Sequence, residues 1–200
     1  MQTLPQQESE LLELARSGDA QAFSELVEIY QRPVYNLCYR MLGNAQEAED
    51  AAQEAFLRAF NGIKRYDPDR KFATWLLSIA ANYCIDQHRR KKFVNVDIEA
   101  VSSAELAERK PGVEKKMIEQ EASEEIQALL AGLSEKDRAA IVLHYWYDYS
   151  YREIADQLEL SESAVKSRLH RARRSLAVAK QDQMAQSTMS TRRQHETAPA

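Results

Sequence analysis

Cations and aromatic rings alternate along residues 61–92, NGIKRYDPDRKFATWLLSIAANYCIDQHRRKK. Residues 58–92 carry nine Lys or Arg and three Asp or Glu, although the formal net charge of the whole chain is −4. Cations neutralise phosphates and flat rings stack on unpaired bases, so this mixture is typical of grooves that bind single-stranded nucleic acid. Aromatic residues at helical spacing also serve core packing, and that alternative stays open. The segment therefore indicates a local polyanion site on an acidic protein.

A second basic stretch follows a helix-turn-helix pattern. Ser150 and Glu153 form a capping box that predicts a helix over residues 151–158, and Ser161 caps a further helix over residues 162–180 after a short turn. This last helix contains six Lys or Arg. Two short helices of which the second is basic are typical of proteins that place a helix in the major groove of DNA. The alternative is a basic helix that is only solvated within a bundle.

An acidic helix is predicted over residues 45–60. Its apolar side is rich in alanine, whereas Asp50, Gln53 and Glu54, spaced by three and four residues, lie together on the other side. A solvated acidic face is the usual explanation of such a pattern. The same face is also able to dock a basic helix of a partner protein.

The elements that position these side chains are predicted to be helical throughout. The 200 residues include only five Gly and five Pro, and no alternating strand pattern is present. Gly18 and Gly43 end helices, residues 62–71 form a loop, and residues 72–92 form a basic-ended helix. In the helix over residues 20–42, one face is expected to point into the protein core. The residues on this face are Phe23, Leu26, Val27, Tyr30, Val34, Leu37, Cys38 and Met41.

Four blocks of charge follow one another along the chain, in the order acidic, basic, acidic and basic. The weakly apolar region 94–117, with Pro111 and Gly112, lies between the two helical halves. This pattern predicts two small helical domains joined by a flexible linker. The chain also has no apolar run of the ~18–20 residues that a membrane span needs, and its polar N-terminus is unlike a signal peptide.

Two cysteines are too few for a disulfide framework, which favours a cytoplasmic protein. Cys84 and His88 share a helical face and Cys38 is a third possible ligand, but a structural zinc site normally needs four ligands. A glycine-rich phosphate loop and a nucleophile motif are absent from the sequence. We therefore predict no metal, no cofactor and no catalytic residue.

Three ordered blocks together resemble the bacterial sigma-70 family of transcription initiation factors, in its extracytoplasmic-function (ECF) group. The blocks are GDAQAFSELVEIYQRPVYNLCYRMLGNAQEAEDAAQEAFLRAF, then FATWLLSIAANYCID, then LSEKDRAAIVLHYWYDYSYREIADQLELSESAVKSRLHRARRSL. The resemblance implies sigma domain 2 over residues 8–92, an acidic linker over 93–122 and sigma domain 4 over 123–180. Residues 181–200 lie outside the family pattern and are expected to be a disordered tail. A stand-alone helix-turn-helix regulator is the alternative, and it leaves the first basic segment unexplained.

The family resemblance also implies partners. It implies a protein without enzymatic activity that binds promoter DNA and core RNA polymerase, through the clamp helices of the largest subunit and the flap of the second-largest subunit. Members respond to stress or envelope signals and are commonly held inactive by an anti-sigma factor, which is therefore an expected partner. The residues implied to bind polymerase are Glu47, Asp50, Gln53 and Glu54.

The DNA contacts implied by the family fall into two sets. For the minus-ten element, with a flipped base captured near Asn82, they are Lys64, Arg65, Tyr66, Arg70, Lys71, Phe72, Trp75, Asn82, Arg89 and Arg90. For the minus-thirty-five element they are Ser161, Ser163, Lys166, Ser167, Arg168, Arg171 and Arg174. In this second set we expect Lys166, Ser167 and Arg168 near base edges and the last two arginines nearer phosphates.

Overall fold

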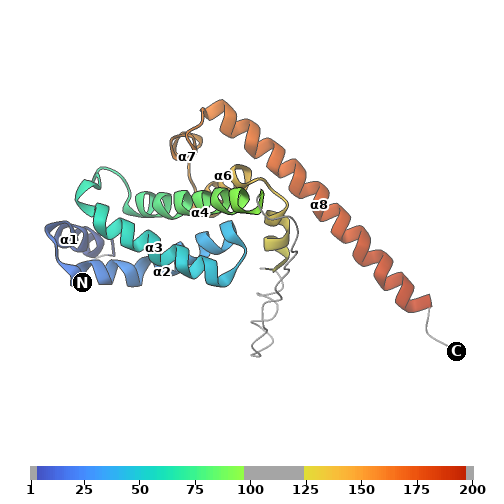
Figure 1. The fold of residues 1–200 in the computed structure, drawn as a ribbon, viewed down its shortest axis with the longest axis horizontal. Coiled ribbons are helices and arrows are strands. Elements are labelled where there is room, and N and C mark those ends of the chain that lie inside the picture. The colour runs from blue at the N-terminus through green and yellow to red at the C-terminus, as the bar shows by residue number, and fades with distance from the viewer. Residues whose placement is uncertain (1–3, 97–123, 197–200) are drawn as a thin grey trace.

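The computed structural model describes residues 4–96 and 124–196, and within these ranges the chain forms helices and no strand (Figure 1). We call α1, α2, α3, η1 and α4 the N-terminal unit, and residues 124–131 with α6, α7 and α8 the C-terminal unit. The predicted all-helical fold with two small domains is confirmed. Most of the predicted linker lies outside the described residues.

Local signals in the sequence set the first helix boundaries. α1 (Leu4–Ser17) ends before Gly18, which has a φ of 106°, and the Asp19 side chain accepts bonds from the first free amides of α2 (Ala20–Leu42). Gly43 ends α2 in the left-handed conformation with a φ of 78°. These helices therefore begin and end where the sequence predicts.

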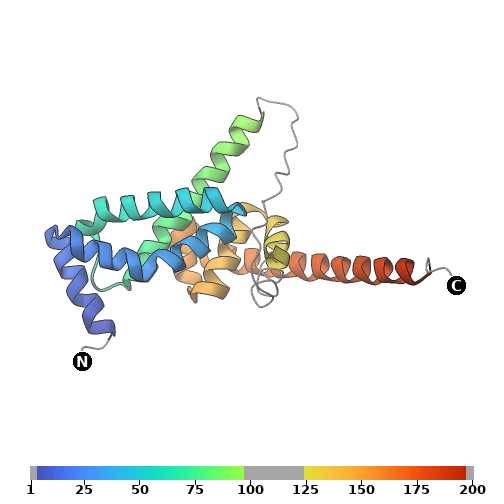
Figure 2. The ribbon, with the colours of Figure 1, turned by 90° about the horizontal axis from the view of Figure 1, so that it is seen from below.

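The next two helices are slightly longer than predicted. α3 (Ala45–Gly62) is capped by Asn44 and continues directly into the short 3-10 helix η1 (Ile63–Arg65). Part of the expected loop is thus helical. α4 (Phe72–Val96) also extends beyond residue 92, and Figure 2 shows its last turns leaving the packed body.

The C-terminal unit has the helix-turn-helix that the sequence predicts. Residues 124–131 are helical, and Ser134 caps α6 (Glu135–Tyr147). The predicted capping box of Ser150 and Glu153 is present at the start of α7 (Tyr151–Leu158). Glu159 supplies the left-handed turn, with a φ of 54°, that leads to α8 (Glu162–Glu196).

The length of α8 differs from the prediction. We expected a helix to residue 180 and a disordered tail after it, but α8 runs to Glu196 (Figure 1). The reason is composition, because residues 177–196 contain no Gly or Pro and are rich in Ala, Gln, Lys, Arg and Met, which favour helix. None of the described helices is long and apolar enough to cross a membrane.

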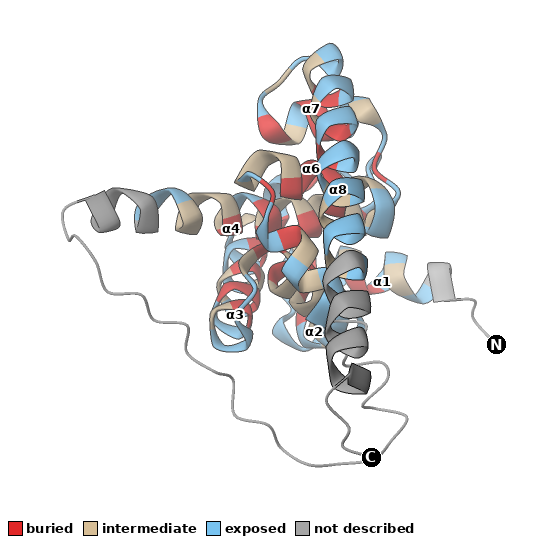
Figure 3. Cartoon of the chain, turned by 90° about the vertical axis from the view of Figure 1, so that its right-hand side faces the viewer, coloured by how far each residue is buried: buried red, intermediate tan, exposed pale blue. Residues whose placement is uncertain are grey.

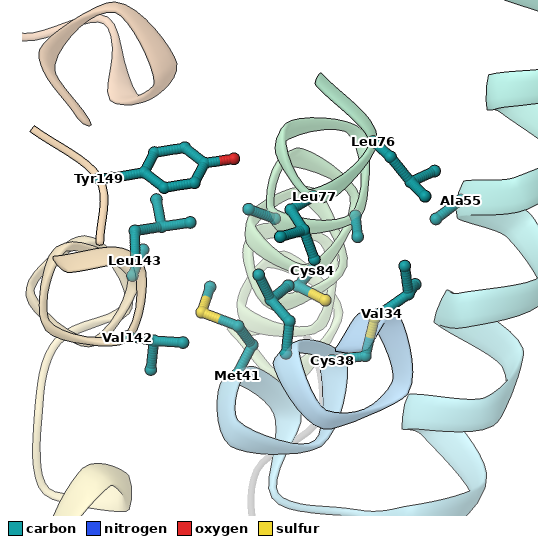
Figure 4. Close-up of a cluster of buried hydrophobic side chains, with 14 of the residues drawn as sticks. Val34, Cys38, Met41, Ala55, Leu76, Leu77, Cys84, Val142, Leu143 and Tyr149 are labelled. Atoms are coloured by element: carbon teal, nitrogen blue, oxygen red, sulfur yellow. The ribbon is translucent and has the colours of Figure 1, made fainter. Parts of the chain in front are cut away.

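The buried side chains of the two units belong to one hydrophobic cluster. Figure 3 marks the buried residues of both units in red. Figure 4 shows Val142, Leu143 and Tyr149 of the C-terminal unit facing Met41 and Leu77 of the N-terminal unit. Each of these five side chains is buried. Because each fully buried aliphatic side chain contributes roughly 1.5–3 kcal/mol, the contact between the units is a substantial apolar interface.

Candidate nucleic-acid interface

The acidic side of α3 is open to solvent, as the sequence predicts. Asp50 and Gln53 are exposed, and Glu47 and Glu54 are half-buried. Glu54 accepts a hydrogen bond from Arg58 Nε at 2.8 Å, an i,i+4 pair at the surface. α3 packs mainly against α2, α4 and η1, so the exposed Asp50 and Gln53 on its acidic side are accessible to another protein.

Two apolar side chains extend this surface, and the sequence analysis did not identify them. Leu57 is 56% exposed and Phe60 is 42% exposed. The Phe60 ring contacts Phe23 edge to face, with 5.1 Å between ring centroids. α3 therefore presents a mixed acidic and apolar face, and carboxylates beside exposed apolar groups are typical of protein-binding surfaces.

The loop before α4 is held by an aromatic cluster. The Tyr66 ring lies 5.4 Å from Phe72 and 5.2 Å from Trp75, and Tyr30 contacts Phe72 from the other side. Tyr66 is 4% exposed and Phe72 is 2% exposed, so neither ring offers a face to a base. The prediction that these two rings contact DNA is therefore not supported, because the packing role that the sequence left open occupies them. Trp75 is half-buried and stays a candidate.

Cations surround this cluster on the outside. The exposed cations of η1 and the following loop are Lys64, Arg65, Arg70 and Lys71, and the loop also exposes Asp67 and Asp69. At the far end of α4, Arg90 is exposed, and Arg89 pairs with Asp86 at 3.0 Å on the surface. The rigid aromatic cluster thus fixes a loop whose outer side is positively charged, as phosphate contacts require.

Asn82 lies on a stripe of α4 that faces the C-terminal unit. Thr74, Ser78 and Asn82 are spaced by four residues, so they share one face of the helix. The cleft beside this stripe has a volume of about 900 Å³, and its lining includes Trp75 and Asn82 from α4 and Gln157 from α7. An exposed amide beside a half-buried indole is a combination that can hold an unpaired base.

One stripe of polar side chains runs along the first four turns of α8. Its spacing of three and four residues places all members on one face, opposite the buried Val165, Leu169 and Ala172. The exposed members are Ser163, Lys166, Ser167, His170, Arg171 and Arg174. Ser161, also exposed, has a structural role here, because its Oγ accepts the Ala164 amide at 3.2 Å and caps the helix.

Arg168 lies beside this stripe and has a partner inside the unit. Its Nη1 donates to Asp137 Oδ1 of α6 at 2.8 Å, and the two side chains are only 25% and 16% exposed. The sequence predicts that Arg168 lies near base edges. In the structure, its ion pair with Asp137 holds α8, the second helix of the helix-turn-helix, against α6. Lys166 remains at the surface, with its Nζ 5.8 Å from the centroid of the Tyr151 ring.

His170 and Arg173 are exposed on α8 and were missed by the sequence analysis. His170 lies in the middle of the polar stripe, one helical turn from Lys166 and from Arg174. The spacing that identified its neighbours would have identified it too.

The candidate metal ligands have other roles. Cys38 and Cys84 are fully buried, and a hydrogen bond between the two thiols, with burial, raises the pKa of Cys84. His88 Nε2 lies 2.9 Å from the Met41 carbonyl oxygen. In the part of the chain that the structure describes, no group of three or more His, Cys, Asp or Glu is placed to hold a metal ion.

Comparison with known proteins identifies both units. Residues 26–94 match Sigma-70 region 2, and residues 123–176 match Sigma-70 region 4. The chain is 40% identical over 168 residues to the ECF RNA polymerase sigma factor SigW of Bacillus subtilis, covering 80% of this chain and 90% of SigW. It is 33% identical to the ECF RNA polymerase sigma-E factor of Escherichia coli K12, covering 83% and 90% of the two chains.

Two solved structures share the fold. CnrH, solved in complex with the cytosolic domain of CnrY, superposes with a TM-score of 0.63 at 24% identity over 88% of this chain and 98% of CnrH. The sigma factor RpoE of Bartonella quintana, solved with the anti-sigma factor NepR, gives a TM-score of 0.60 at 20% identity over 78% and 95% of the two chains. With both conserved sigma regions present in order and a close relative matched over most of its length, this chain belongs to the ECF group of sigma-70 family RNA polymerase sigma factors.

Proposed function

We propose that this sigma factor uses three separate faces to direct transcription initiation. The side of α3 with Asp50 and Gln53 docks on core polymerase, the α4 stripe with Asn82 captures the melted minus-ten strand, and α8 reads the minus-thirty-five duplex. We place sigma domain 2 at residues 8–92 and sigma domain 4 at residues 123–180. The stand-alone regulator is set aside because it leaves residues 26–94 without a role, although they match Sigma-70 region 2.

The observation that carries the upstream assignment is the polar stripe of α8. Ser161 caps the helix, and the stripe leaves one polar face of α8 exposed, as in helices that enter the major groove. Lys166, Ser167 and His170 lie in the N-terminal half of α8's polar stripe and are proposed to meet base edges, and Arg171 and Arg174 are proposed to meet phosphates. We assign Arg168 to positioning α8 on α6.

The minus-ten assignment rests on the exposed groups around the buried aromatic cluster. We propose that Lys64, Arg65, Arg70 and Lys71 hold the backbone of the single strand while Asn82 and Trp75 hold a flipped base. Arg89 and Arg90 extend the same basic surface toward the duplex. Unpairing a base costs a few kcal/mol, and contacts that form only with the open strand offset part of that cost.

The remaining proposals concern partners and chemistry. The protein acts by binding and carries no catalytic group of its own, and it works in the cytoplasm, where the polymerase is. Relatives of this fold have been solved with CnrY and with the anti-sigma factor NepR, which supports an anti-sigma factor as a partner of this chain as well. The mixed acidic and apolar face of α3 is a docking surface that such a partner would cover.

Reconstitution with core RNA polymerase from the same bacterium tests the function directly. Core enzyme with the protein should transcribe a genomic library from a limited set of start sites, and those sites should share two upstream sequence elements. Core enzyme alone is the control. If the protein adds no start sites to those of core enzyme, the proposed function is wrong.

A further inference from the structure

One hydrogen bond joins α1 to the aromatic cluster beneath the loop of residues 66–71, which we call the minus-ten loop. The Tyr30 hydroxyl of α2 donates to the Glu8 carboxylate of α1, with 2.8 Å between the two oxygen atoms, and both side chains are half-buried. Burial, together with this bond, raises the pKa of the Tyr30 hydroxyl, so the group stays protonated and remains a donor. A hydrogen bond to a charged acceptor is stronger than a neutral one, so Glu8 restrains Tyr30 firmly.

Stacked rings connect Tyr30 with the minus-ten loop. Its ring contacts Phe72, the first residue of α4, edge to face with 5.4 Å between centroids, and Phe72 contacts Tyr66 in the same manner at 5.4 Å. The Tyr66 hydroxyl donates in turn to the main-chain carbonyl of Arg70. A continuous series of contacts therefore leads from Glu8 to the residue whose guanidinium we assign to the DNA backbone.

α1 also lies next to the start of this loop. Leu11 and Ala15 bury α1 in the core, and the helix packs against η1 as well as against α2. Figures 1 and 2 show it at the end of the N-terminal unit where the chain passes from η1 into α4. Burial raises the pKa of the Tyr66 hydroxyl, the charge of Glu8 raises it further, and the charge of Arg16 lowers it. Both charged side chains of α1 therefore lie close to Tyr66.

The hydrogen bonds within the minus-ten loop join near neighbours. The Arg70 amide donates to the Asp67 carbonyl at 3.1 Å, and the Asp69 amide donates to Asp67 Oδ1 at 3.0 Å. Such bonds form a local turn but do not fix where the turn lies on the unit. The aromatic cluster fixes that position, and α1 restrains the cluster through Glu8.

We propose that Glu8 and Tyr30 are positioning residues of the minus-ten site, which hold the loop in the geometry that receives the single strand without contacting DNA themselves. This inference rests on the proposed function of the loop. Glu8 lies before residues 26–94, which match Sigma-70 region 2, so the support comes from outside the matched segment. A loop that is already ordered loses less conformational entropy when the strand binds, so loss of the support weakens binding without removing a DNA contact.

Removal of the Glu8 charge gives opposite results for a positioning role and for an electrostatic role. A carboxylate near bound phosphates repels them, so its loss alone would strengthen DNA binding, most of all at low salt. Loss of the support for the loop would weaken binding instead. The direction of the change in affinity therefore identifies the role of Glu8.

Four single substitutions separate these roles. Glu8→Ala removes the acceptor, and Tyr30→Phe removes the donor but keeps the ring in the cluster. Glu8→Gln keeps an oxygen acceptor and loses only the charge. Glu13→Ala removes an exposed carboxylate from the same helix and is the control. Circular dichroism checks the helical content of each full-length variant, and hydrogen–deuterium exchange of the amides of residues 66–71 measures the order of the loop.

DNA capture is measured with holoenzyme assembled from core RNA polymerase and each variant. The probe is a fluorescent promoter fork, single-stranded over the minus-ten element, taken from a promoter found by the reconstitution above. Glu8→Ala and Tyr30→Phe should each speed exchange in the loop and weaken binding to the fork by about three- to tenfold, the effect of one hydrogen bond. The double variant should bind no worse than either single variant, because both substitutions remove the same bond.

The remaining variants and a second probe are the controls. Glu8→Gln and Glu13→Ala should both bind the fork like the unchanged protein. Every variant should also bind a duplex that carries only the minus-thirty-five element like the unchanged protein, because α8 does not contact the loop or α1.

The outcomes separate this inference from the function that it rests on. Equal or tighter binding of the fork by the Glu8→Ala holoenzyme overturns the inference, and so does unchanged exchange in the loop. Faster exchange with unchanged binding overturns it equally, because the loop then captures DNA without α1. If the unchanged holoenzyme does not prefer the fork to the fully paired promoter, the minus-ten function is wrong and this inference falls with it, whatever the exchange shows. If Glu8→Ala loses helical content, Tyr30→Phe is measured by the same criteria.

Discussion

The ion pair between Arg168 and Asp137 decides whether Arg168 reads DNA or holds α8 in place. The Nη1 to Oδ1 distance is 2.8 Å, and the side chains are 25% and 16% exposed, so both charges have lost most of their contact with water. At an effective dielectric constant of about 20, two charges 4 Å apart attract by about 4 kcal/mol. Desolvation of both groups offsets most of this attraction. We expect a net coupling of about 1–2 kcal/mol, above the value of a fully exposed pair.

A double-mutant cycle measures this coupling. Arg168→Ala and Asp137→Ala each leave a partly buried charge without its partner, so each should lower the free energy of unfolding by about 2 kcal/mol. The loss in the double variant should be about 1–2 kcal/mol smaller than the sum of the two single losses, and this difference is the coupling energy. Urea unfolding followed by Trp146 fluorescence in a Trp75→Phe background reports the C-terminal unit. Arg171→Ala, exposed on the same helix, is the control and should change stability by less than about 0.5 kcal/mol.

Binding to the minus-thirty-five duplex then separates the two roles. Because the pair holds α8 on α6, Arg168→Ala should weaken binding to all sequences by a similar factor. His170→Ala should instead relax preference at one base pair, at a cost of about 1–3 kcal/mol on the cognate element. A coupling energy of zero, together with lost preference at a single base pair in Arg168→Ala, would refute this reasoning and return Arg168 to the reading face.

Three further predictions test the other faces. Asp50→Arg combined with Glu54→Arg should abolish most retention of the protein on immobilised core polymerase while changing stability by no more than ~0.5 kcal/mol per site, since both lie on the surface of α3. Asn82→Ala should lower permanganate reactivity of the melted promoter more than it lowers closed-complex occupancy, because the strand is unpaired only after opening. Ser150→Ala should cost about 1 kcal/mol of stability in thermal unfolding by removing the cap of α7. Because the folded pKa of Glu153 is lowered, its contribution is fully present above the unfolded pKa of 4.5 and is lost as the pH falls from there through the lower folded pKa, so the Ser150→Ala deficit should shrink in acid.

Helix boundaries were predictable because each is set by residues next to it in sequence. The Ser150 capping box and the Ser161 cap depend on side chains within three residues, and both form as the pattern requires. Neighbouring residues do not determine whether an aromatic side chain packs in the core or stacks on a base. Tyr66 and Phe72 are as suited to stacking on a base as to packing in a core, and only the three-dimensional arrangement with Tyr30 decides for packing.

The site residues on α8 show a similar limit. Spacing alone places Lys166, His170 and Arg174 on one face, and exposure agrees. Spacing also placed Arg168 outward, but it could not reveal that Asp137, 31 residues earlier in the chain, would take its charge. Helical periodicity cannot predict an ion-pair partner on another helix, because that partner depends on how the two helices cross.

The contact between the two units was invisible in the sequence for a further reason. Its acceptors are main-chain carbonyls, which every residue has, so nothing about Thr74 or Ser78 marks them as partners. Only the donor side carries information, and a glutamine or tyrosine is too common to signal it. These two bonds, donated by Tyr149 and Gln157, constrain the residue types of the C-terminal unit only, whereas the contact of Arg40 with the Trp146 ring also depends on a side chain of the N-terminal unit.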